Sequence, residues 1–79
     1  MKLSKKEITE KYEAATNELA IALTKIYEIR NTFKYLFEQA DDNGDPYFTL
    51  DEALVKLGAA LAEANVYTKE YKDELNKQA

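Results

Sequence analysis

The chain has no cysteine, no histidine and no tryptophan among its 79 residues, and only two glycines and one proline. Without cysteine no disulfide can cross-link the fold, and without histidine or cysteine the common zinc ligand sets are missing. The same absences remove the most frequent general base and the thiolate nucleophile of enzymes. No glycine-rich phosphate loop occurs either. We therefore expect a protein that is not an enzyme.

Clusters of basic residues and long apolar runs are also absent. Fifteen acidic residues stand against 11 basic ones, and the bases are interleaved with acids, so we expect no nucleic-acid partner. No run approaches the roughly 18–20 apolar residues of a membrane span. The first residues, "MKLSKKEITEKYEAA", are too polar for a signal peptide. These features predict one helical domain over residues 1–79 without a targeting segment or membrane partner. We expect it to be cytoplasmic.

The first predicted helix begins at a capping box and carries a long apolar stripe. Ser4 and Glu7 have the spacing at which each side chain bonds the backbone N–H of the other residue. Apolar residues then recur at alternating spacings of four and three: Ile8, Tyr12, Ala15, Leu19, Ala22, Ile26, Ile29, Phe33, Leu36 and Ala40. This periodicity predicts a helix over about residues 4–40, whose weak points for bending are the poor helix formers Thr16–Asn17 and Asn31–Thr32.

Two shorter helices are predicted to follow. Thr49 and Glu52 have the spacing of a second capping box, and an apolar stripe over about residues 50–64 follows them. Gly58 lies inside this stripe, where we expect close packing to require it. Asn65 suits a helix end, and Thr68 suits the cap of a third helix over about 68–77. The predicted fold is all-α, a small three-helix bundle with a long first helix.

The segment "DDNGDPYFTLDE", residues 41–52, resembles the calcium-binding loop of the EF-hand family. The resemblance implies side-chain oxygen ligands from Asp41, Asn43 and Asp45. It also implies the backbone carbonyl of Tyr47 and a bidentate carboxylate from Glu52. Pro46 departs from the family, which has glycine at that place for a sharp turn. The alternative is a plain acidic turn between two helices. We therefore expect no cofactor, with calcium as the alternative.

The middle of the first predicted helix, "LAIALTKIYEI", is apolar on nearly every side. Such a helix is either buried on more than one face or offers a face to a partner. Tyrosine is enriched in the residues that dominate binding energy at interfaces, and the chain has six. The predicted interaction surface comprises Ile21, Leu23, Tyr27, Tyr35, Tyr47 and Phe48. We expect a protein partner, or self-association through the first helix.

Deliberate helix caps, strong helix formers and the lack of reactive side chains give the chain a further resemblance. In these respects it resembles de novo designed helical mini-proteins, many of which are made as binders. Asn17 and Asn31 depart from an idealised helix. The sequence therefore favours a non-enzymatic interaction module of this designed kind. If the chain is a designed one, we expect it to have no natural compartment. A single EF-hand-like calcium module and a structural scaffold without a ligand are the alternatives.

Overall fold

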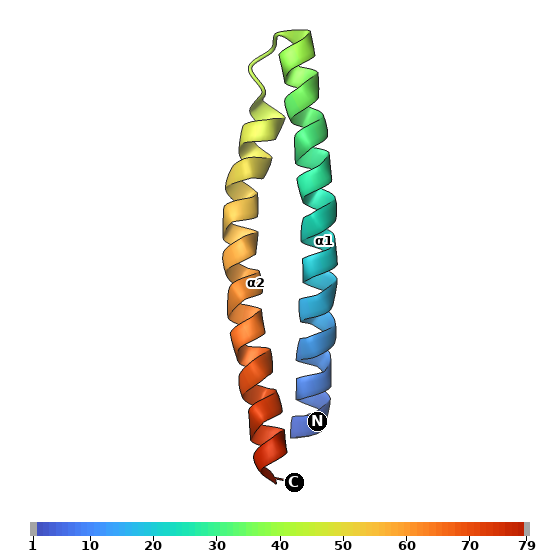
Figure 1. Ribbon diagram of the computed structural model, residues 1–79, viewed down its shortest axis with the longest axis vertical. Coiled ribbons are helices and arrows are strands. Elements are labelled where there is room, and N and C mark those ends of the chain that lie inside the picture. Colours follow the sequence, from blue (N-terminus) through green and yellow to red (C-terminus); the bar gives the residue numbers. More distant parts are fainter. Residues whose placement is uncertain (1, 79) are drawn as a thin grey trace.

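The computed structural model describes residues 2–78, one residue short of the predicted domain at each end. These residues form two long helices, α1 (Lys5–Ala40) and α2 (Asp45–Gln78), joined by a short turn. The helices lie antiparallel in a hairpin that measures 59 × 19 × 18 Å, with the two chain ends together at the end opposite the turn (Figure 1). The all-α prediction is confirmed. The predicted three-helix bundle is wrong, because the described residues contain no third helix.

α1 begins and ends close to where the sequence places it. The backbone N–H of Glu7 donates to Ser4 Oγ (3.1 Å), and the backbone N–H of Ser4 donates to Glu7 Oε1 (3.3 Å), so the predicted capping box is confirmed. The helix is continuous through Thr16 and Asn17. It ends at Asp41, whose φ of 56° lies in the left-handed region that terminates many helices.

α2 begins earlier than predicted, at Asp45 instead of about residue 50. Gly44 has a φ of +69°, its N–H donates to Asp42 Oδ1 (2.8 Å), and its carbonyl accepts from the N–H of Phe48 (3.1 Å). Pro46 therefore lies in the first turn, where its missing N–H costs no helical hydrogen bond. The predicted start at Thr49 is wrong, because Gly44 turns the chain and α2 is already under way at Thr49.

The predicted break between a second and a third helix is also wrong, because α2 is continuous through Asn65 and Thr68. Intrinsic propensity is a weak signal that tertiary contacts override. Here Thr68 is only 8 % exposed, and its hydroxyl lies 3.1 Å from that of Thr16 on α1. Contact with α1 thus holds the helix through residues that on their own favour an end.

The core of the hairpin is one layer deep and follows a seven-residue repeat. On each helix every buried or half-buried inner position is three or four residues from the next, the spacing of two helices packed along their length. The inner positions of α1 are Thr9, Tyr12, Thr16, Leu19, Leu23, Ile26, Arg30, Phe33 and Phe37. Those of α2 are Tyr47, Leu50, Leu54, Leu57, Leu61, Ala64, Thr68, Tyr71 and Leu75. Leu23 and Leu54 are the most buried large apolar residues described, 5 % and 2 % exposed.

Only four of the ten residues in the stripe predicted for α1 lie in this core. Tyr12, Leu19, Ile26 and Phe33 do face α2, whereas Ala15, Ala22, Ile29 and Leu36 are exposed on the flank of the helix. The inner row that replaces them includes threonines and an arginine, which hydrophobicity alone would not select. The threonine hydroxyls and Arg30 Nη1 are hydrogen-bonded, which lowers the cost of placing these side chains inside. Thr9, for example, donates to the carbonyl of Lys5 (2.8 Å).

The two glycines predict opposite responses to alanine. A Cβ at Gly58 would meet no atom within 4 Å, so the expected packing reason is absent and Gly58→Ala should raise the free energy of unfolding by about 1 kcal/mol. A Cβ at Gly44 would lie 2.8 Å from the ring of Phe37 at a positive φ, so Gly44→Ala should lower it by about 2–4 kcal/mol. Urea unfolding followed by circular dichroism measures both. Equal shifts in the two variants would contradict the described turn.

The contact between the Thr16 and Thr68 hydroxyls predicts that substitutions at these two positions change the unfolding free energy non-additively. Thr16→Val or Thr68→Val alone leaves one buried hydroxyl without its partner and should cost about 1 kcal/mol of unfolding free energy. The double variant replaces both hydroxyls by methyl groups of the same shape, so it should be no less stable than either single variant. A double-mutant cycle from urea unfolding gives the coupling. Strictly additive losses would show that the two side chains do not interact.

Candidate interaction surface

Each flank of the hairpin is formed by one row from each helix, and the two flanks differ in chemistry. The rows follow from the helical repeat, since residues seven apart lie on one line along a helix. We name as the polar edge Glu13, Ala20, Tyr27 and Lys34 of α1 with Asp51, Gly58, Asn65 and Lys72 of α2. We name as the apolar edge Ile8, Ala15, Ala22, Ile29 and Leu36 of α1 with Ala53, Ala60 and Tyr67 of α2; near the termini the α2 row continues into the charged Glu74.

The polar edge is closed by ion pairs between the helices. Lys72 Nζ lies 3.0 Å from Glu13 Oε2, and Arg30 Nη1 donates to Asp51 Oδ1 at 2.8 Å. The side chain of Arg30 is only 23 % exposed, which makes its pair less screened by water than an open surface pair. These charges help to fix the register of α1 against α2. They also leave this edge ill suited to an apolar partner.

Arg30 organises two of the tyrosines that the sequence assigns to the interaction surface. Its guanidinium carbon lies 5.0 Å from the centre of the Tyr27 ring and 5.9 Å from that of Tyr47. Both distances fall within the range of cation–π attraction. Arg30 Nε is buried without a hydrogen-bond partner, so the rings and Asp51 supply the environment of this side chain. Tyr27 and Tyr47 thus have a structural role within the hairpin.

The apolar edge has no comparable cover. Ile29 is 40 % exposed, Leu36 is 49 % exposed and Tyr67 is 52 % exposed, and the alanines between them bring the backbone close to the surface. Tyr67 also packs edge-on against Tyr12, with ring centres 6.2 Å apart, which places this row of α2 beside α1. One ion pair, Lys5 with Glu74 (3.5 Å), marks the end of this edge near the termini.

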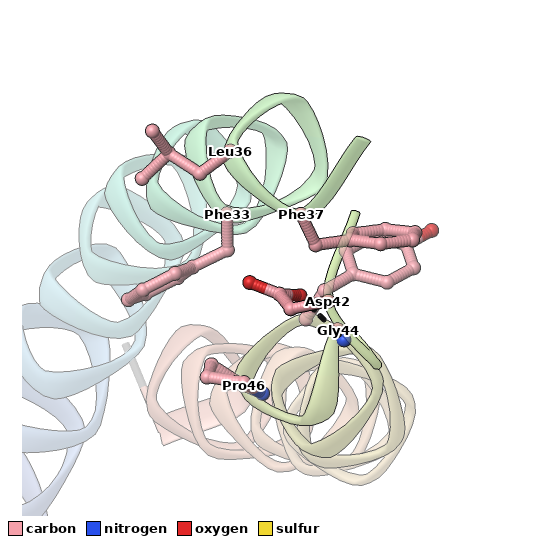
Figure 2. Close-up of a pocket in the computed structure, with 7 residues that line it drawn as sticks. Phe33, Leu36, Phe37, Asp42, Gly44 and Pro46 are labelled. Carbon is pink, nitrogen blue, oxygen red and sulfur yellow. Dashed lines mark hydrogen bonds between the residues drawn. The ribbon is translucent and has the colours of Figure 1, made fainter. Parts of the chain in front are cut away.

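At the turn three aromatic rings, those of Phe37, Tyr47 and Phe48, lie against one another. The Phe37 ring lies 5.6 Å from that of Tyr47 and 5.8 Å from that of Phe48, and this cluster seals the end of the core. Figure 2 shows Phe33, Leu36 and Pro46 on one side of the turn and the Phe37 ring on the other. A cavity of about 190 Å³ lies among these residues, so the apolar edge ends in a small hollow.

The structure does not gather the predicted interaction residues on one face. Leu23 is buried between the helices, and Tyr27 and Tyr47 lie beside Arg30. Ile21 and Tyr35 are 72 % and 62 % exposed on the outer side of α1, with a shallow hollow of about 300 Å³ beside Ile21. Phe48, 53 % exposed, belongs to the cluster at the turn. The residues that do form a continuous apolar surface, Ile29 and Leu36 among them, were assigned to the core by sequence.

The residues that match the EF-hand ligands are likewise spread over different elements. Asp41 ends α1, Asn43 lies in the turn, and Asp45, Tyr47 and Glu52 belong to α2, with Glu52 about two turns from Asp45. Between residues 2 and 78 no three acidic side chains come together as a metal site would need. α2 begins at Asp45, inside the segment, so the five residues do not lie in a single loop.

Neither described helix is long and apolar enough to cross a membrane. Comparisons with protein-family models, curated proteins and solved structures find no match to the chain.

The dispersed carboxylates predict a flat response to calcium. Millimolar calcium chloride should leave the midpoint of thermal unfolding unchanged to within about 1 °C, because a ligand stabilises a fold only through a site present in the folded state. Circular dichroism at rising calcium concentrations measures the midpoint. A rise that Glu52→Gln abolishes would instead establish the EF-hand-like alternative.

Proposed function

We propose that the chain is a non-enzymatic protein–protein interaction module that binds through its apolar edge. The observation that carries the proposal is the difference between the two edges of one hairpin. One edge is bridged by Glu13–Lys72 and Arg30–Asp51, whereas the other presents aliphatic, small and aromatic side chains up to the Lys5–Glu74 pair near the termini. A continuous row of exposed apolar side chains is the feature by which interaction surfaces are commonly recognised.

The limited burial of the chain supports the same proposal. A compact protein of 9.1 kDa exposes about 4,900 Å² of surface. The hairpin exposes 6297 Å², because two helices packed along one seam bury only the sides that face each other. Apolar burial is the main favourable contribution to folding. Covering a second side would therefore stabilise the hairpin as well as bind the partner.

The shape of the apolar edge suits a helical partner. Ala15 and Ala22 are small and exposed, which lets a helix axis approach closely, and Ile29 and Leu36 supply apolar side chains toward the turn. Binding of this kind is the packing of one helix face into the groove beside another. The resemblance of the sequence to designed helical binders agrees with such a role. A designed origin itself stays a prediction.

Site-specific photo-crosslinking tests which edge binds. A photo-reactive amino acid placed at Ala22, on the apolar edge, should form adducts with a second polypeptide in the cells that express the chain. The same group at Ala20, an exposed alanine on the polar edge, is the matched control and should form few. Gel shifts and mass spectrometry of the adducts give the yields.

A second substitution connects the adduct to the proposed contact. Ile29→Gln, one helical repeat from Ala22 on the same edge, should reduce the Ala22 adduct by about tenfold, because it places a polar amide in the contact. Ile21→Gln, on the outer side of α1, should leave the yield unchanged. Equal yields from Ala22 and Ala20, or no adduct from either, would contradict the proposed function.

A further inference from the structure

We infer that the occupant of the apolar edge is a second copy of this chain, with α1 packed antiparallel on α1 of the other copy to give a four-helix bundle. The inference rests on the proposed function and adds the identity and the geometry of the partner. Three features of the described residues support it: the exposed area, the order of large and small side chains along α1, and the order of charges beside them.

The hairpin exposes an excess of surface that is comparable in size to the area a stable dimer buries on each partner. The hairpin exposes about 1,400 Å² more than a compact protein of its mass. A standard protein–protein interface buries about 800 Å² on each partner, and obligate dimers bury more. Pairing two hairpins along the apolar edge turns a core one layer deep into a core shared by four helices, which is the common arrangement of four-helix bundles.

Side-chain sizes along α1 are self-complementary about Ala22. The apolar row reads Ile8, Ala15, Ala22, Ile29 and Leu36 in steps of seven. If two such rows run antiparallel with Ala22 on the two-fold axis, Ile29 lies opposite Ala15 of the other copy and Leu36 lies opposite Ile8. Each isoleucine at 29 then faces a small residue, and the two Ala22 methyl groups meet at the centre. An isologous interface requires this kind of self-matching order.

Charges beside this row match under the same axis. Glu18 and Lys25 lie on the neighbouring row of α1, one on each side of the level of Ala22, and both are exposed. Glu18 lies four residues before Ala22 and Lys25 three residues after it, so antiparallel pairing about Ala22 brings Glu18 of one copy to within one residue of the level of Lys25 of the other, twice. Lys25 Nζ now lies 3.9 Å from Glu28 in a pair that is 73 % and 67 % exposed, and such pairs contribute little. Lys25 can therefore turn toward Glu18 of the second copy.

Sedimentation of the full chain tests the dimer. The chain is expected to sediment at twice its monomer mass at about 100 μM, a concentration at which even a micromolar dimer is mostly formed. Ala22→Glu places two carboxylates face to face on the axis and should raise the dimer dissociation constant by at least about 100-fold. Ala20→Glu, the same change on the polar edge, should leave the constant within about threefold of the original. Circular dichroism confirms that each variant keeps its helices.

Exchanging charges tests the antiparallel geometry. Glu18→Lys places two lysines opposite each other at both contacts, and Lys25→Glu does the same with two carboxylates, so each variant should dimerise about tenfold more weakly than the original chain. Mixing the two variants in equal amounts restores two opposite-charge contacts and should restore dimer of the original affinity. The double variant, which only exchanges the positions of the charges, should also dimerise normally.

Two results would overturn the inference. One is a chain that sediments as a monomer up to about 1 mM, far above the dissociation constant of an interface of standard size. The other is a dimer that Ala22→Glu does not weaken, or whose charge variants are not rescued by mixing. The photo-crosslinking result keeps the proposed function separate. A monomeric chain whose Ala22 still crosslinks to another protein excludes the second copy as partner and leaves the apolar edge as the interaction surface.

Discussion

The hairpin depends on how the turn at residues 41–44 sets the register between α1 and α2. Gly44 takes a positive φ directly beneath the ring of Phe37, in a place where any side chain would collide with that ring. The carboxylate of Asp42 accepts from the N–H of Gly44, and α2 then begins at once with Pro46 in its first turn. Because a helix is rigid along its length, fixing the start of α2 against the end of α1 fixes the pairing near the termini as well.

In that register polar residues of α1 lie within hydrogen-bond distance of polar residues of α2 inside the core. Thr16 lies opposite Thr68, and Arg30 reaches Asp51 between two tyrosine rings. A buried polar group without a partner is costly, so a slip of α1 against α2 would leave several such groups unpaired at once. The polar pairs thereby select one alignment among those that an all-apolar seam would allow, as polar core residues do in coiled coils.

The same geometry accounts for the proposed function. Two helices packed along one seam leave each helix with most of its surface in water. In this hairpin the exposed apolar side chains are unevenly distributed between the two edges. Ion pairs occupy the edge that contains Glu13 and Asp51, while Ile29 and Leu36 lie on the other. An apolar edge with small residues at its centre and larger ones toward its ends suits a helical partner. A second copy of the chain meets that requirement, because large and small side chains, and opposite charges, match along two antiparallel copies of α1.

The sequence by itself determined the helical character of the chain, the start of α1 at Ser4 and its end near Ala40, because caps and turn residues act locally. It did not determine which side of α1 faces inward. Two apolar stripes share Tyr12, Leu19, Ile26 and Phe33, and hydrophobicity favours the one with Ile29 over the one with Arg30. The continuity of α2 was also decided by tertiary contact, since the weak helix formers near Thr68 are held against α1. The seven-residue spacing from Tyr47 to Leu75 was the available signal of that continuity. The candidate surface could be predicted only as far as its location on α1, because exposure depends on where the second helix lies.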